Sequence, residues 1–170
     1  DTNSYIKFEK FLLKFCDIIK KIPEIEIVVK LHPSQDKHND DIKNIFKKID
    51  SSILVYHVKP ITELISMSDV VVTVSPEGFD PTTVILESMI QEKPTMNIIL
   101  DDNLFEFEYV KDNAVLSIFF NDQLETNLKN ILFNNEIKNN LIKNGKNHIK
   151  NYLTNPGTSS KYFAKIIDSF

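Results

Sequence analysis

The sequence contains no arginine and only one cysteine, and both absences limit the chemistry available to the protein. All 20 basic residues are lysines, so a bound anion would be held by lysine, histidine or hydroxyl groups, without the bidentate fork of a guanidinium. A single cysteine, Cys16, excludes a disulfide or a cysteine–metal site within one chain. Its apolar neighbours recur at helical spacing, which predicts a buried thiol in the core.

Glycine is also scarce, with three residues in 170, and long apolar runs are missing. The sequence has neither a G-x-G-x-x-G dinucleotide fingerprint nor the G-x-S-x-G turn of a serine hydrolase. No apolar run reaches the roughly 18 residues of a membrane span, and we find no secretory signal. We therefore expect a cytoplasmic protein that is neither a dehydrogenase nor an α/β-hydrolase.

Charge and composition favour a globular domain and disfavour a nucleic-acid partner. The net charge is −4 without a dense lysine cluster, so we expect no nucleic-acid partner. His38, His57 and His148 lack the spacing of a metal site, and no Asp-x-Asp motif occurs, so we expect no metal and no cofactor. The hydrophobic content of 42% allows a sizeable core. The sequence opens in a helical pattern, and we expect a domain cut from a longer protein.

Hydrophobic periodicity predicts strands that alternate with helices along the whole chain. The predicted strands cover residues 25–31, 53–56, 69–74, 94–100 and 114–119. The predicted helices cover residues 3–22, 42–49, 60–67, 81–92, 122–133, 135–152 and 162–170. This order indicates one α/β domain over residues 1–170, a Rossmann-like three-layer sandwich with a mainly parallel sheet, in which 153–170 form a crossover-type C-terminal helix.

Ligands of such sheets bind beyond the carboxyl ends of the strands, which points to the loops 32–38, 57–60, 75–80 and 101–109. His32 ends the first predicted strand, and Lys30 points to the same side of that strand. An imidazole at this edge can contact an anionic ligand. The alternative is a strand-end histidine that bonds a nearby backbone group.

The stretch S-P-E-G-F-D-P-T-T follows the third predicted strand and leads into a helix. Asp80 is placed to cap that helix, and Pro81 to be its first residue. The free N–H groups of the first turn are suited to a phosphate, although the Asp80 carboxylate would repel a diphosphate. We therefore expect Ser75 and the hydroxyls of Thr82 and Thr83 as contacts, with a plain capped turn as the alternative.

Glu87 lies one turn after Thr83, at the edge of a predicted buried stripe. A carboxylate at this position can accept hydrogen bonds from a ribose diol, and a solvated glutamate is the alternative. The predicted stripe consists of Ile85, Leu86, Met89 and Ile90.

These features occur in a fixed order: strand–K-L-H-P, then S-D-V-V-V-T-V-S, then T-T-V-I-L-E-S-M-I-Q-E-K-P-T-M-N-I. Over residues 25–100 that order resembles the C-terminal, donor-binding half of GT-B glycosyltransferases. The K-x-H-P element is also similar to that of CDP-glycerol glycerophosphotransferases and bacterial polysialyltransferases. The resemblance implies a nucleotide-sugar or CDP-alditol donor, no bound metal, and an N-terminal acceptor-binding domain in the same protein. Peripheral membrane association of the full-length protein is compatible with it.

The resemblance also implies roles for individual residues. His32 looks like the catalytic histidine that contacts the donor phosphate, with Lys30 or Lys93 helping to offset leaving-group charge. Glu87 resembles the glutamate that grips the ribose, and the backbone of Val58–Ile61 falls where the base is contacted. The nucleotide-sugar-binding residues implied in this way are Lys30, His32, Val58, Ser75, Glu77, Thr82, Thr83 and Glu87.

The sequence departs from the family in the loop before Glu87. Retaining members often carry a second glutamate eight residues earlier, where this chain has Phe79, and Glu77 stands ten residues earlier. UDP-GlcNAc 2-epimerases typically carry a Gly-Gly pair, whereas the loop of this chain contains only Gly78. CDP-glycerol transferases usually carry an Asp-Tyr-Ser-Ser-like run, whereas in this chain the serine stands beside Pro76. The donor and the subfamily stay open for these reasons.

Three functions are compatible with these observations. The first is the donor-binding half of a glycosyltransferase of polysaccharide or glycan biosynthesis, which would bind its donor but be inactive without its N-terminal half. The second is a UDP-GlcNAc 2-epimerase-like or CDP-alditol phosphotransferase domain. The third is a non-catalytic Rossmann-like module for docking or regulation.

Overall fold

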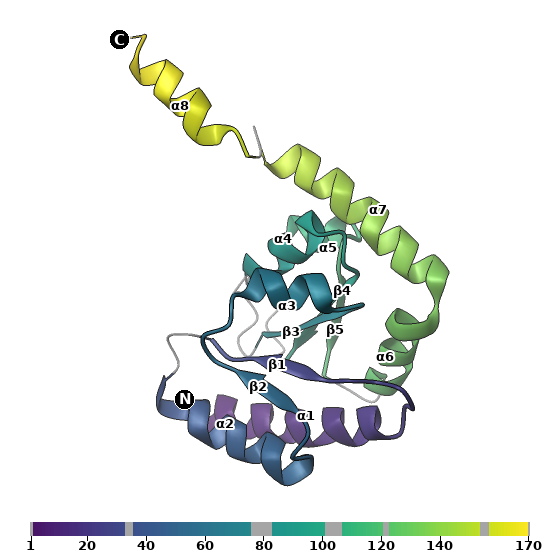
Figure 1. Ribbon diagram of the computed structural model, residues 1–170. Coiled ribbons are helices and arrows are strands. Elements are labelled where there is room, and N and C mark those ends of the chain that lie inside the picture. Colours follow the sequence, from purple (N-terminus) through teal and green to yellow (C-terminus); the bar gives the residue numbers. More distant parts are fainter. Residues whose placement is uncertain are drawn as a thin grey trace.

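The computed structural model describes residues 2–32, 36–75, 83–100, 107–120, 123–153 and 157–169 (Figure 1). Its strands are β1 (Val28–Lys30), β2 (Leu54–Tyr56), β3 (Val71–Ser75), β4 (Thr95–Ile99) and β5 (Leu116–Phe119). Its helices are α1 (Thr2–Lys20), α2 (Asp36–Ile49), α3 (Ile61–Met67), α4 (Thr83–Ile90), α5 (Glu108–Lys111), α6 (Leu124–Phe133), α7 (Asn135–Tyr152) and α8 (Ser159–Ile167).

The strands alternate with helices and pair in parallel, which confirms the predicted α/β class and its Rossmann-like character. They form two sheets within the described residues, β1–β2 and β3–β4–β5, where the sequence suggested one. In the larger sheet, Thr73 of β3 lies opposite Asn97 of β4, which in turn lies opposite Ser117 of β5. Since a helix returns the chain between successive strands, the carboxyl ends of the strands face a common edge.

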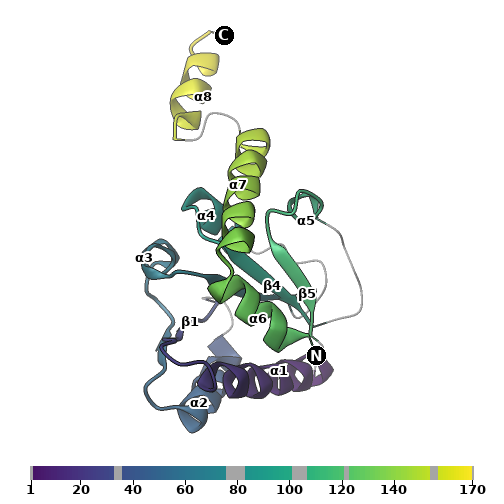
Figure 2. The ribbon, with the colours of Figure 1, turned by 90° about the vertical axis from the view of Figure 1, so that its right-hand side faces the viewer.

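The two sheets share one apolar core on the side of α1, α2 and α6. Val29 of β1 and Val55 of β2 pack against the same cluster as Met96 and Ile98 of β4. Phe11 of α1, at 1% exposure, belongs to the centre of this cluster. Figures 1 and 2 show α1 and α2 together on one side of the strands, with α3 and α4 on the other. The result is the expected layered arrangement.

The opposite face of the larger sheet is polar near its middle and is covered by α4. All five residues of β4 are buried, as expected of a strand that is covered on both faces. Helix α7 crosses α4 closely at Gly145, where a Cβ atom would lie 3.2 Å from Cγ of Met89. Glycine therefore allows the two helices to approach each other.

Several element boundaries differ from the sequence prediction. Helix α2 begins at Asp36 instead of residue 42, because its first turn is polar and carries no apolar repeat. Pro60 is the N-cap of α3 with ψ of 130°, not its first helical residue. Helix α5 begins within the predicted loop 101–109 and was not predicted, since one turn is too short to show periodicity. Ile90 is 55% exposed and does not belong to the buried stripe, in which Ser88 takes part instead.

Two further predictions concern the core and the last helix. Cys16 is buried, as predicted, and its burial raises the pKa of the thiol to about 11. Helix α8 has the predicted amphipathic pattern, and none of its nine residues is buried. Within the part of the chain that the structure describes, no helix is long and apolar enough to cross a membrane.

Candidate functional site

The first group of predicted residues lies at the carboxyl ends of β1 and β2. The Lys30 ammonium donates hydrogen bonds to the backbone oxygens of Leu31, at 2.7 Å, and His57, at 2.9 Å. Lys30 therefore ties the end of β1 to the loop after β2 and retains one further N–H donor. His32 is exposed beyond β1, and Val58 is 87% exposed in the loop after β2.

The second group is built around Ser75, the last residue of β3. Its hydroxyl, 5% exposed as a residue, donates to Oδ1 of Asn97 at 3.1 Å. The Thr73 hydroxyl donates to the same oxygen at 2.9 Å. Ser75 thus uses its proton within the sheet, and it would have to release Asn97 in order to donate to a phosphate oxygen.

The third group lies at the start of α4, the helix that follows β3. Thr83, the first residue of α4, is exposed, and Glu87 follows one turn later. Oε2 of Glu87 is buried and has no hydrogen-bond partner among the described residues. A buried carboxylate oxygen without a donor is costly, so this atom can accept a hydrogen bond beyond those among the described residues.

A similar unsatisfied group lies in α2, the helix that follows β1. Asn39, at 3% exposure, continues the buried line of Ile42 and Phe46. Neither its amide oxygen nor its amide nitrogen has a hydrogen-bond partner within the described residues. Two helices that begin at the carboxyl edge therefore each bury polar atoms that lack partners among the described residues.

Several predicted residues lie outside the described residues. These are the predicted contacts Glu77 and Thr82 and the predicted helix start at Asp80 and Pro81. Most of the predicted loop 101–109 is also outside them.

Sequence reasoning missed Asn39 and Asn97, although Asn97 could have been noticed as a polar residue between the apolar Met96 and Ile98 of β4. It also left His148 without a specific partner. His148 is 5% exposed, and its Nδ1 lies 2.7 Å from Oδ2 of Asp112. This contact joins α7 to α5, so the structure gives His148 a packing role.

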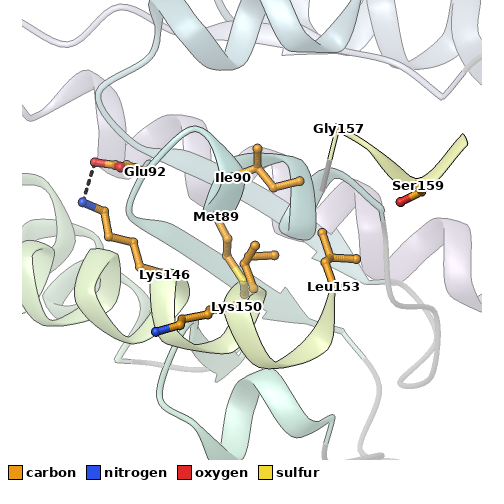
Figure 3. Close-up of a pocket in the computed structure, with 9 residues that line it drawn as sticks. Met89, Ile90, Glu92, Lys146, Lys150, Leu153, Gly157 and Ser159 are labelled. Carbon is orange, nitrogen blue, oxygen red and sulfur yellow. Dashed lines mark ion pairs between the residues drawn. The ribbon is translucent and has the colours of Figure 1, made fainter. Parts of the chain in front are cut away.

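A concave surface of about 670 Å³ lies at the other end of α4 (Figure 3). Met89, Ile90, Lys146 and Leu153 line it, and an ion pair of 2.8 Å joins Lys146 to Glu92 at its rim. Because α4 runs back from the carboxyl edge, this pocket is at the opposite, amino edge, and no predicted site residue lines it. Lys150 and Ser159 also line it, so its lining is part apolar and part basic.

The described residues contain no group of three or more His, Cys, Asp and Glu side chains that could hold a metal ion. Comparisons with protein-family models, with curated proteins and with solved structures found no match. The fold defines the class of this chain as a Rossmann-like α/β protein with parallel sheets.

Proposed function

We propose that this chain is the donor-binding half of a nucleotide-sugar-dependent transferase of glycan or polysaccharide biosynthesis. The alternating α/β fold supports this proposal, because such sheets bind ligands at their carboxyl edge. Lys30 and Ser75 are the last residues of β1 and β3, His32 follows β1, and Glu87 lies one turn into α4, the helix that follows β3.

The observation that carries the proposal is the buried Oε2 of Glu87, which has no partner among the described residues. A ribose diol offers two O–H donors, and a carboxylate can accept both. The Lys30 ammonium, with one donor left after its bonds to Leu31 and His57, lies on the neighbouring sheet, where a diphosphate would extend. In this arrangement His32 would offset the charge of the leaving group.

Calorimetric titration with UDP, CDP, GDP and CMP tests the proposal directly. We expect at least one nucleotide to bind, and we expect Glu87→Gln to weaken that binding by about 10- to 100-fold, because a hydrogen bond to a charged group contributes about 1.5–3 kcal/mol. Glu92→Gln is the matched control, because Glu92 follows the opposite end of α4 and its ion pair with Lys146 is exposed. Absence of heat with every nucleotide at millimolar concentration would overturn the proposal.

Stability measurements separate a ligand contact from a structural role of Glu87. Glu87→Gln neutralises a carboxylate whose buried Oε2 has no partner among the described residues, so it should leave the free energy of unfolding unchanged or increase it. Binding would then weaken while the free protein keeps its stability. A Glu87→Gln variant that loses both stability and affinity would instead favour a structural glutamate and the non-catalytic module.

A further inference from the structure

Charge is distributed unevenly along the chain, although the net charge is small. Residues 137–170 contain six lysines and a single carboxylate, Asp168, for a net charge of +5. Residues 1–136 contain 14 lysines and 23 carboxylates, for a net charge of −9. The C-terminal fifth of the chain is therefore a basic segment on an acidic protein.

The structure concentrates this segment on one projecting surface. Helix α8 extends away from the sheets beyond the end of α7 in both views (Figures 1 and 2). Three lysines of α7 and two of α8 are exposed, and of these Lys146 forms the ion pair with Glu92. We call this set the C-terminal surface; its lysines are Lys143, Lys146, Lys150, Lys161 and Lys165.

Helix α8 adds an apolar stripe to the C-terminal surface. Tyr162, Phe163, Ile166 and Ile167 are 56%, 63%, 39% and 57% exposed. Their spacing of one, three and four residues places them along one side of the helix, with Lys161 and Lys165 away from that stripe. Apolar side chains gathered in this way at the surface mark a site of contact with a membrane or another protein.

We propose that the C-terminal surface binds the face of a membrane that contains anionic lipids, with the stripe of α8 in the headgroup region. A short basic amphipathic helix with aromatic residues has the chemistry of an interfacial anchor. Lysines of α7 and α8 would contact the lipid phosphates, and the acidic remainder of the chain would be repelled from them. The proposal does not depend on the nucleotide site.

Other occupants fit the C-terminal surface less well. A second copy of this chain would bring two basic surfaces together, and like charges disfavour that contact. A nucleic acid would pair with the lysines but would leave Phe163 and Ile166 in water. Anionic lipid is the partner that accommodates both the charge and the apolar stripe.

Sedimentation with vesicles tests the proposal. The probes are vesicles of phosphatidylcholine alone and of phosphatidylcholine mixed in equal parts with phosphatidylglycerol. We expect binding to the anionic vesicles only, with an affinity that falls as salt is raised. Lys161→Gln combined with Lys165→Gln should weaken binding by about 25-fold, about fivefold for each lysine. Phe163→Ser combined with Ile166→Ser should weaken it by about tenfold or more.

The matched control is Lys47→Gln combined with Lys48→Gln, which removes the same charge from exposed positions on α2, on the far side of the molecule from α8. This control should bind the anionic vesicles like the unchanged chain. The α8 positions are exposed, so circular dichroism should show that every variant folds. Three results would each overturn the proposal: no binding to anionic vesicles, a dimer that forms through the stripe without lipid, or binding of RNA through these lysines without binding of vesicles.

Discussion

Replacement of Asn97 by leucine should reveal how strongly the buried polar contacts hold β3 to β4. The side-chain oxygen of Asn97 accepts hydrogen bonds from the hydroxyls of Thr73 and Ser75, and all three residues are buried. Leucine has the same branching as asparagine but has no acceptor. The substitution therefore leaves two buried hydroxyls without this partner while it largely preserves packing.

The magnitude follows from the state of each hydroxyl after the substitution. A buried donor without an acceptor costs about 1–3 kcal/mol. The Thr73 hydroxyl retains a long contact of 3.4 Å with the backbone oxygen of Met96, so its cost falls at the low end of that range. Ser75 loses the acceptor that the structure describes for it. We expect Asn97→Leu to lower the free energy of unfolding by about 2–4 kcal/mol.

Urea unfolding followed by far-UV circular dichroism measures this loss, since the chain contains no tryptophan. The control is a triple variant with Thr73→Val, Ser75→Ala and Asn97→Leu, in which no donor is left without an acceptor. Its stability should return to within about 1 kcal/mol of the unchanged chain, because apolar replacement of all partners is nearly neutral. The reasoning fails if Asn97→Leu costs less than about 0.5 kcal/mol, or if the triple variant is the least stable of the set.

Three further predictions use other parts of the structure. Burial raises the pKa of Cys16 from 9.0 to about 11 in the folded chain, so the free energy of unfolding should keep its full contribution from this thiol below pH 9 and lose it as the pH rises from 9 through 11. Cys16→Ala should abolish this part of the pH dependence in urea titrations. Gly145→Leu should destabilise the chain by about 1–3 kcal/mol by forcing α7 off Met89, whereas Gly145→Ala should stay within about 1 kcal/mol, as thermal unfolding can show. Lys30→Met should cost about 1–3 kcal/mol and speed hydrogen exchange at the end of β1, because its bond to the His57 oxygen is lost; unchanged exchange there would contradict this role.

Much of the fold could be predicted because its long helices have strong periodicity. Helices α1, α6 and α7 lie within about two residues of their predicted bounds, because each repeats apolar residues over several turns. The separation of the strands into two sheets could not be predicted, since pairing depends on residues distant in the sequence. The exposure of Ile90 was missed for a similar reason: Gly145 of α7 packs against Met89 and leaves Ile90 exposed.

The candidate site shows the same division between local and distant information. Residues at strand ends, such as His32 and Ser75, could be placed at the carboxyl edge from local patterns alone. The bond from Ser75 to Asn97 could not be predicted, because it joins residues 22 positions apart on neighbouring strands. The unsatisfied amide of Asn39 was also missed, because no pattern in the sequence distinguishes a buried asparagine from a solvated one.

The two proposed binding surfaces should act independently, because the nucleotide site uses strand ends and α4, whereas the C-terminal surface uses α7 and α8. Glu87 is in the middle of α4 and does not line the pocket beside Ile90, which adjoins the end of α7 and the start of α8. A membrane bound by α8 would therefore meet the amino edge and leave the nucleotide edge open to solution. We expect Lys161→Gln with Lys165→Gln to leave nucleotide affinity unchanged, and Glu87→Gln to leave vesicle binding unchanged. If either variant impairs both calorimetric and sedimentation readouts, the two surfaces are coupled and this placement of the sites is wrong.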